Sequence, residues 1–371
     1  MTASAPGQSG PGSQSPARFV RPELRELKAY HLDQVECVHK LDQNEVPWDL
    51  PRRLKEEVAR RLLERDWARY PDFHSDELRR DLAERHGHPM EGVLVGNGSN
   101  ELLGIALEAL VAAGTGVLGA EPGFGLYPMF VLRAGGRYQP VPPADDLSLP
   151  LEALRAHVER DPRRPLILCT PNNPTGAAVS PEEVAELAEA LDAPLLLDNA
   201  YGEFCEHDYR PLLANHPNLL LFRTFSKAWS LAGLRLGYLL AHPDLINELI
   251  KVKLPYNLGH GTAVAGRVAL EAESVTRRRV AAIIGRRPQW AEMFESFGLD
   301  PVPSQANFLL VRCGSPERSG RIRDGLAERG ILVRKVGHYP GLSGCLRVSV
   351  GSGVALRDTR AALEQISKGE G

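Results

Sequence analysis

The middle of the chain alternates short apolar runs with segments of helical periodicity. The runs VLVG (93–96), LILC (166–169), LLLD (195–198) and LLLF (219–222) are almost free of polar residues, which is typical of strands covered on both faces. The segment SPEEVAELAEAL has the spacing of an amphipathic helix, with Ser180 at the cap position and Pro181 at the first helical position. This alternation predicts an α/β fold with a mainly parallel central sheet.

The last third of the chain has a different pattern. Two helical stretches, about 261–287 and on to 295, precede the short apolar runs NFLLVR, GILVRK and CLRVSVG, and the segment SGRIRDGLAERG between the first two runs has helical spacing. This pattern predicts a smaller α+β domain. We therefore expect a disordered tail at 1–18, an N-terminal segment at 19–50 that packs on the small domain, a large domain at 51–255 and a small domain at 256–371.

Composition and charge exclude several classes of protein. The 371 residues are 43% hydrophobic and 25% charged, with a net charge of -3, so there is no general attraction to nucleic acid or to an anionic membrane. No apolar run has the length of a membrane span, and the Ser/Gly/Pro-rich start lacks the apolar core of a secretory signal. The five cysteines form no CxxC pair, and His86 and His88 lack a metal-binding frame. We expect a reduced, cytoplasmic protein without a metal site.

Polar residues follow four of the predicted strands at the point where each ends. They are Gly96–Ser99, Asn172 with Asn173, Asp198 with Tyr201, and Ser226 with Lys227. In open parallel sheets, ligands bind beyond the carboxyl ends of the strands. One catalytic centre could therefore collect all of these side chains.

The residue types in this set suit one cofactor in particular. A lysine with a lowered pKa can form a Schiff base with an aldehyde, a buried carboxylate can keep a ring nitrogen protonated, and amides at a helix N-terminus bind phosphate. A Tyr and an Asn can hold a phenolic oxygen. Together these needs describe pyridoxal phosphate. Each residue alone has a simpler explanation, since Asp198 could cap a helix, Tyr201 could pack in the core and Lys227 could be solvated.

The motifs around these residues resemble those of the fold-type I pyridoxal phosphate aminotransferases. Superfamily motifs are PNNPTG (171–176), LLLDNAY (195–201) and SKAWSLAGLRLGY (226–238), whereas RYPD (69–72), GNGSNELL (96–103) and GLSGCLRVSVG (341–351) are similar to the histidinol-phosphate aminotransferases. The resemblance covers the chain from about Tyr30 onward. It implies a large cofactor-binding domain with a mainly parallel sheet and a smaller α+β domain.

The resemblance implies catalytic roles for three residues. Lys227 would bind the cofactor aldehyde and then move a proton between the substrate carbon and the cofactor carbon. Asp198 would pair with the pyridinium nitrogen, and Tyr201 with Asn173 would hold the ring hydroxyl oxygen. Phe124 in EPGFGLY would stack on the ring, although Tyr127 is a second aromatic residue that could take this place.

The resemblance also assigns residues to the cofactor phosphate and to the substrate. The phosphate would be held by amides around Ser99 and Asn100, by Thr224, Ser226 and Arg235, and by Tyr70 of the second subunit, so that a homodimer shares its active sites. Arg347, Arg334 and Asn44 would bind the substrate, since an arginine fork suits both carboxylate and phosphate. Three positions depart from the family pattern, namely Phe124 in place of Tyr, Asn199 in place of Glu, and Val46.

The implied reaction is amino-group transfer between glutamate and 2-oxoglutarate on one side and histidinol phosphate and imidazole acetol phosphate on the other, in histidine biosynthesis. Its substrates are small molecules. The same fold and cofactor also serve an aromatic amino acid aminotransferase or a threonine-phosphate decarboxylase, and these stay as alternatives. A non-catalytic regulator with this fold usually carries an added DNA-binding domain, for which the tail before residue 19 is too short.

Overall fold

The computed structural model describes residues 15–25, 36–144 and 146–368. Contacts divide the chain into two units, residues 1–36 and residues 37–371. In the first unit the described residues form the 3-10 helix η1 (Pro16–Phe19) and the short helix α1 (Pro22–Arg25). Residues 1–14 of the predicted tail lie outside the described residues, as does Tyr30, where the family resemblance begins. The predicted domain boundaries remain predictions.

The second unit contains a seven-stranded sheet in the order β2-β8-β7-β6-β5-β3-β4. Strand β8 is antiparallel to both of its neighbours, and the other neighbouring pairs are parallel. The sheet is therefore mainly parallel, as predicted. Its strands are β2 (Val93–Gly96), β3 (Gly116–Ala120), β4 (Arg137–Val141), β5 (Leu166–Cys169), β6 (Leu195–Asp198), β7 (Leu219–Thr224) and β8 (Gly237–Leu240).

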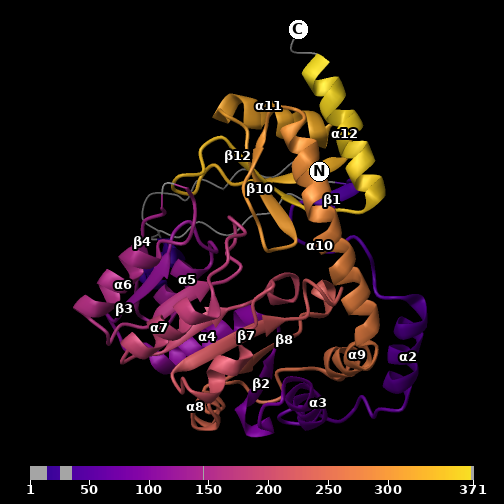
Figure 1. Ribbon diagram of the computed structural model, residues 1–371. Coiled ribbons are helices and arrows are strands. Elements are labelled where there is room, and N and C mark those ends of the chain that lie inside the picture. Colours follow the sequence, from indigo (N-terminus) through magenta and orange to yellow (C-terminus); the bar gives the residue numbers. More distant parts are fainter. Residues whose placement is uncertain (1–14, 26–35, 145, 369–371) are drawn as a thin grey trace. The chain divides into compact units, whose positions relative to one another are not determined.

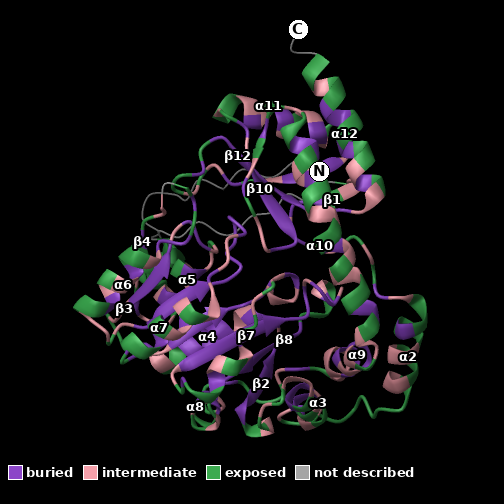
Figure 2. Cartoon of the chain, viewed as in Figure 1, coloured by how far each residue is buried: buried purple, intermediate pink, exposed green. Residues whose placement is uncertain are grey.

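The central strands of this sheet are apolar throughout because both of their faces are covered. Leu195 and Leu197 of β6 belong to one hydrophobic cluster, whereas Leu196 belongs to another. Successive side chains of a strand point to opposite faces, so these two clusters lie on opposite sides of the sheet. Figure 2 shows the central strands of this sheet, such as β7, in the colour of buried residues. This double burial is the reason why the runs lack the polar alternation of a half-exposed strand.

A second sheet has five strands in the order β1-β11-β12-β10-β9. Residues from the N-terminal segment form its edge strand, β1, which runs parallel to β11 with His39 opposite Ile331. The three apolar runs of the last third form β10, β11 and β12, as predicted. The strands are β1 (His39–Leu41), β9 (Asp300–Pro301), β10 (Phe308–Arg312), β11 (Ile331–Lys335) and β12 (Cys345–Ser349).

The helices of the second unit begin and end at recognisable signals. Ser180 caps α7 through a capping box with Glu183, and Pro181 is its first residue, as predicted. Helix α11 starts earlier than its apolar periodicity indicates, because Ser315 accepts a hydrogen bond from the Arg318 amide and Pro316 follows it. The helices are α2 (Arg52–Leu63), α3 (Asp76–His86), α4 (Ser99–Leu110), α5 (Tyr127–Arg133), α6 (Leu151–Arg160), α7 (Pro181–Ala190), α8 (Pro243–Leu249), α9 (His260–Glu271), α10 (Glu273–Glu295), α11 (Pro316–Ala327) and α12 (Gly353–Lys368).

The long helix α10 runs from α9 to the smaller sheet. It follows α9, which packs on α2 and α3, and it also contacts β9, β10 and α12 of the smaller-sheet region. Figure 1 shows this course as an orange helix that rises from α9 towards β10. Short 3-10 helices are η2 (Met90–Gly92), η3 (Gly202–Phe204), η4 (Arg210–Ala214) and η5 (Ala232–Leu234). Among the described residues, no helix has both the length and the apolar character that crossing a bilayer requires.

The topology determines where polar loop residues meet. Because β8 is antiparallel to both β2 and β7, strand β2 runs in the same direction as β5, β6 and β7. The carboxyl ends of these four strands therefore lie along one edge of the sheet. This edge carries the four polar segments singled out in the sequence.

Candidate active site

Lys227 follows the end of β7 and its amine is held by the N-terminal segment. The Lys227 Nζ donates a hydrogen bond to the Gln43 carbonyl oxygen at 2.8 Å and lies 6.0 Å from the centre of the Tyr201 ring. Burial of the amine, followed by the charge of Arg347, lowers the pKa of Lys227 to about 8. At neutral to mildly basic pH a substantial fraction of this amine is therefore unprotonated and nucleophilic.

Asp198 ends β6 and is hydrogen-bonded on both carboxylate oxygens. The Tyr127 hydroxyl donates to Asp198 Oδ2 at 2.6 Å, and the Ala200 amide donates to Oδ1 at 3.2 Å. Only 4% of Asp198 is exposed, and this burial raises the pKa of its carboxyl group while the bond from Tyr127 opposes the rise. The arrangement presents a carboxylate in a low-dielectric environment, where a nearby cation is strongly favoured.

Tyr201 contacts the N-terminal segment through its hydroxyl group. Asn44 Nδ2 donates to the Tyr201 hydroxyl oxygen at 2.9 Å. Asn44 is itself fixed, since its backbone amide donates to Ser349 Oγ and its carbonyl accepts from Asn307 Nδ2. Asn44 has a φ of 56°, a left-handed conformation that Asn tolerates better than most residues. Asn44, which was predicted to bind the substrate, is thus hydrogen-bonded to Tyr201, which was predicted to bind the cofactor.

Asn173 and Arg347 meet although they come from different sheets. Arg347 lies on β12, and its Nη1 donates to Asn173 Oδ1 at 2.6 Å while its Nη2 donates to the Asp42 carbonyl oxygen at 2.7 Å. Only 8% of Arg347 is exposed. Arg334 lies opposite Arg347 in the pairing of β11 with β12. Two cationic side chains therefore come from adjacent strands beside the carboxyl edge of the larger sheet.

The Gly-rich turn after β2 leads into α4 and lies against Arg235. Gly98 has a φ of 78° and a ψ of 163°, a conformation open essentially to glycine alone. A Cβ at this position would come within 2.7 Å of Arg235 Nη2, so the absence of a side chain leaves room for the guanidinium group. Ser99 and Asn100 form the first turn of α4, whose amides and dipole favour an anion.

The other predicted phosphate ligands come from the end of β7. Arg235 Nη1 donates to Ser226 Oγ at 3.2 Å, and the Ser226 amide donates to Thr224 Oγ1 at 3.1 Å. Thr224, Ser226 and Arg235 therefore form one connected group. Together with the start of α4 it forms a cationic, amide-rich recess of the type that binds phosphate groups.

Two of the predicted cofactor contacts, Phe124 and Tyr70, are aromatic, and their surroundings differ. The Phe124 ring lies 5.5 Å from the Tyr127 ring in an edge-to-face arrangement, so it is close to the partner of Asp198. Tyr127 is buried and its hydroxyl is engaged by Asp198, which leaves Phe124 as the aromatic side chain available for stacking. Tyr70 is 79% exposed, and its ring stacks on that of Tyr256 with 4.5 Å between the ring centroids.

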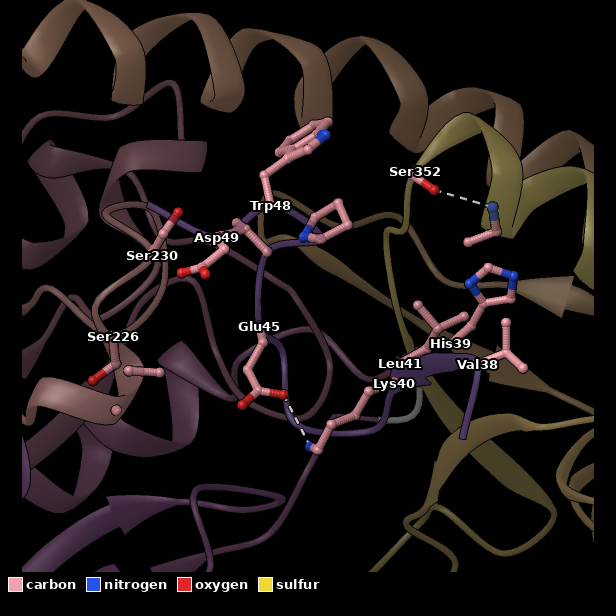
Figure 3. A pocket seen from close by; sticks show the side chains of 15 residues that line it. Val38, His39, Lys40, Leu41, Glu45, Trp48, Asp49, Ser226, Ser230 and Ser352 are labelled. Carbon is pink, nitrogen blue, oxygen red and sulfur yellow. Dashed lines mark hydrogen bonds and ion pairs between the residues drawn. The ribbon is translucent and has the colours of Figure 1, made fainter. Parts of the chain in front are cut away.

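A pocket of about 390 Å³ lies beside the loop that carries Lys227. Figure 3 shows that Lys40 and Glu45, which form an ion pair at 2.9 Å, and Trp48 of the N-terminal segment line it together with Ser226 and Ser230. Ser226 thus contributes both to the predicted phosphate group and to the wall of this pocket. Within the described part of the chain, no group of three or more His, Cys, Asp and Glu residues could hold a metal ion.

Three contacts of the site were not predicted from the sequence. They are the bond from Tyr127 to Asp198, the bond from Lys227 to the Gln43 carbonyl, and a buried ion pair between Arg223 and Glu203 behind the strand ends. The position of Tyr127 three residues after Phe124 indicated that the two rings lie close together. It did not indicate that the partner of the Tyr127 hydroxyl is Asp198. The backbone carbonyl of Gln43 has no side-chain signature at all.

Comparisons with known proteins agree with this geometry. The family model Aminotransferase class I and II matches residues 37–366. The histidinol-phosphate aminotransferase 1 of Carboxydothermus hydrogenoformans is 38% identical over 335 residues, which are 90% of this chain and 95% of that protein. The histidinol-phosphate aminotransferase of Deinococcus radiodurans is 35% identical over 356 residues, with coverage of 95% and 96%.

The chain is also similar to a solved structure. The crystal structure of histidinol-phosphate aminotransferase from Sinorhizobium meliloti in complex with pyridoxal-5'-phosphate has a TM-score of 0.83 and 27% identity, and the match covers 91% of this chain and 92% of that one.

Proposed function

This chain belongs to the class I and II aminotransferase family, and from that premise we propose that it transfers an amino group between histidinol phosphate and 2-oxoglutarate in histidine biosynthesis. Its cofactor in this proposal is pyridoxal 5'-phosphate. One observation carries the proposal. Lys227, whose pKa is lowered, and the buried carboxylate of Asp198 lie at the same edge of the sheet. The names of the curated relatives, at 33–38% identity, support the substrate.

The residues of the site fit this cofactor. Gly98, the start of α4 and Arg235 together suit a phosphate, because the absence of a Cβ at Gly98 leaves room for the guanidinium group beside the amides that could bind the anion. Asp198 suits a protonated ring nitrogen because its carboxylate is buried, and Tyr201 with Asn173 offers hydrogen-bonding groups for the ring hydroxyl oxygen. Phe124 offers a ring face for stacking.

When bound, pyridoxal phosphate supplies an electron-withdrawing ring that stabilises negative charge on the substrate carbon. The chain's own residues would do the rest. Asp198 would hold a proton on the ring nitrogen, because a buried carboxylate favours a neighbouring cation. The neutral Lys227 amine would accept the proton of the amino-bearing carbon and deliver it to the next position, which requires a pKa near the working pH.

Arg347 would orient the substrate anion. Its guanidinium group is already held by Asn173 Oδ1 and the Asp42 carbonyl, so it is positioned before substrate binds. Such a fork binds the carboxylate of glutamate and the phosphate of histidinol phosphate with similar geometry. Arg334 on the neighbouring strand adds a second positive charge, which is consistent with two substrates that carry different anions.

We also propose a homodimer in which Tyr70 completes the partner's phosphate site. The support is the exposure of Tyr70, together with that of Leu63 and Trp67 near it in the chain, at 83% and 74%, and of Leu254, at 73%, two residues before its stacking partner Tyr256. An exposed apolar surface of this kind marks an interaction site in a soluble protein. The cytoplasmic location expected from the cysteines also remains a proposal.

The test of the proposed function is the amino-group transfer itself. We expect the purified protein with pyridoxal phosphate to form glutamate from 2-oxoglutarate and histidinol phosphate, measured with a coupled dehydrogenase. Lys227→Ala should lower kcat by about 10⁴-fold, since the proton-transfer group is lost, and it should also lose the visible absorption of the bound cofactor. Lys251→Ala, which removes an exposed lysine paired with Glu248, is the control and should retain activity.

The alternatives give distinct results in the same assay. Faster glutamate formation from phenylalanine than from histidinol phosphate would identify an aromatic amino acid aminotransferase instead. Release of carbon dioxide from phosphothreonine without glutamate would identify a decarboxylase. A colourless protein that does not respond to added pyridoxal phosphate would refute the proposal as a whole.

A further inference from the structure

A buried ion pair lies directly behind the catalytic strand ends. Arg223 Nη2 on β7 and Glu203 Oε1 in η3 are 2.8 Å apart, and 9% and 8% of the two side chains are exposed. Neither residue belongs to the cofactor or substrate contacts proposed above. A buried ion pair is a weak source of stability, because the loss of hydration offsets most of the attraction between the charges. Its role therefore needs an explanation other than stability.

The hydrogen bonds of this pair extend to the two segments that carry the catalytic residues. Arg223 Nη1 donates to Asn199 Oδ1 at 2.9 Å, and Asn199 follows Asp198 in the chain. Glu203 Oε1 accepts from Trp229 Nε1 at 3.1 Å, and Trp229 lies two residues after Lys227. The pair thus joins the loop after β6 to the loop after β7.

Asn199 extends the connection to a third strand end. Its Nδ2 donates to the Thr170 carbonyl oxygen at 2.5 Å, just beyond β5 and close to Asn173 in the chain. The amide of Asn199 donates to this carbonyl and accepts from Arg223 at the same time. A carboxylate at this position would accept from Arg223 but could not donate to Thr170.

The charged groups that surround the pair do not compete for its central contacts. The Arg85 guanidinium lies 5.0 Å from the Trp229 ring and pairs with Glu273, and Arg210 pairs with Asp208. Burial, followed by the charge of Arg223, lowers the pKa of His86 to about 2. The imidazole ring is therefore neutral and does not act as a second cation. Arg223 therefore keeps Glu203 and Asn199 as its ion-pair and hydrogen-bond partners.

We propose that Arg223 and Glu203 are positioning residues that fix the separation between the segment of Asp198 and Tyr201 and the segment of Lys227. This inference rests on the proposed function as far as the cofactor is concerned, but it does not depend on which amino acid is the substrate. Catalytic groups must be held to a fraction of an ångström, and a misplacement of about 1 Å can lower a rate by about 100-fold. The network supplies that constraint from behind the site.

The test replaces both members of the pair, which leaves the net charge unchanged. In the holoenzyme, Arg223→Met with Glu203→Leu should fold, because apolar residues of similar size commonly replace buried ion pairs without loss of stability. We expect the dissociation constant of pyridoxal phosphate for the apoenzyme to rise about tenfold and kcat to fall about 10- to 100-fold. The KM for 2-oxoglutarate should change little, because Arg347 is held by other contacts.

The control replaces a second ion pair, on two helices that carry none of the proposed site residues. Arg267 Nε and Asp81 Oδ2 are 2.7 Å apart and join α9 to α3, so Arg267→Met with Asp81→Leu should leave cofactor affinity and kcat unchanged. If the Arg223 and Glu203 double variant does not fold, Trp229→Phe is the second test. It removes the donor to Glu203 and keeps an aromatic ring, and we expect a several-fold fall in kcat with little change in Tm.

The outcomes separate this inference from the proposed function. A folded double variant or Trp229→Phe variant with wild-type cofactor affinity, kcat and pH profile would show that the pair is merely structural. A wild-type protein that binds no pyridoxal phosphate would overturn the proposed function and the positioning role together. A wild-type protein that binds the cofactor but prefers another amino donor would overturn only the proposed substrate.

Discussion

At the scale of single residues, the site depends on how burial and nearby charges tune two ionisable groups. The lysine amine and the Asp198 carboxyl are both buried, and burial shifts their pKa values in opposite directions, lowering the first and raising the second. Arg347 adds to the effect on Lys227, whereas Tyr127 opposes the effect on Asp198. Each neighbour can be removed separately, so each contribution can be measured.

Removal of Arg347 should raise the pKa of Lys227. In the wild-type apoenzyme, the rate of pyridoxal phosphate binding should increase with pH, with a midpoint at about pH 8, and level off at higher pH, where the amine is neutral. Arg347→Gln removes a cation that disfavours the ammonium form, so the midpoint should move to higher pH, towards the ordinary lysine value of about 10.4. Stopped-flow absorbance would measure the rate. Arg312→Gln, an arginine paired with Asp300, is the control, and equal midpoints in both variants would contradict the prediction.

Removal of the Tyr127 hydroxyl should raise the pKa of Asp198 further. Tyr127→Phe deletes the 2.6 Å hydrogen bond to the carboxylate, and a hydrogen bond to a charged group contributes about 1.5–3 kcal/mol. The carboxyl group would then be protonated at higher pH, so the acidic limb of the kcat profile should move upward and cofactor affinity should fall about tenfold or more. A pH profile that matches the wild type would show that Ala200 alone orients Asp198.

At the scale of elements, the strand-to-helix turn before α4 combines a backbone requirement with a binding function. Glycine is needed at position 98 both for its φ of 78° and for the close approach of Arg235. The sequence pattern identified a turn and a helix start at this place. The family resemblance assigned Arg235 to the same phosphate as the start of α4, but nothing in the sequence indicated that Arg235 lies against Gly98, because the two positions are joined only when β2 and β7 lie on either side of β8.

Gly98→Ala should therefore impair phosphate binding as well as stability. The strained backbone costs about 1–3 kcal/mol, and the added methyl group would displace the Arg235 guanidinium. We expect a lower Tm and a dissociation constant for pyridoxal phosphate that is raised about 10- to 100-fold, measured by titration of the apoenzyme. Gly104→Ala in the middle of the same helix meets nothing within 4 Å, so it should be neutral or slightly stabilising. Equal effects at both positions would contradict this reading of the turn.

At the scale of the whole molecule, the remaining question is how two chains would complete each site. The described residues of one chain place Lys227, Asp198, Tyr201 and Arg347 together but leave Tyr70 exposed and stacked on Tyr256. In the proposed homodimer, Tyr70 contacts the phosphate of a second copy of the chain. This geometry makes the shared site testable by mixing variants.

Mixing two variants that are each impaired should restore activity. We expect Lys227→Ala to be inactive and Tyr70→Phe to bind pyridoxal phosphate about tenfold more weakly, as a lost hydrogen bond to a phosphate predicts. In a mixed dimer, Lys227 of the Tyr70→Phe chain would meet the intact Tyr70 of the other chain. At limiting cofactor, dissociated and reassociated mixtures should then exceed the activity of the Tyr70→Phe protein alone. Sedimentation as a monomer, or the absence of any gain, would contradict the shared site.

The sequence by itself determined the strands that its continuous apolar runs form, the start of α7 and the residue types of the candidate site. Continuous apolar runs predicted buried strands because both faces of the sheet are covered, and Ser180 with Pro181 predicted the start of α7 because cap chemistry is local. Tertiary structure alone decided that β8 is antiparallel, that Tyr127 holds Asp198 and that the Gln43 carbonyl holds Lys227. These features depend on contacts between residues far apart in the chain, and no local propensity or spacing encodes which distant partner a side chain meets.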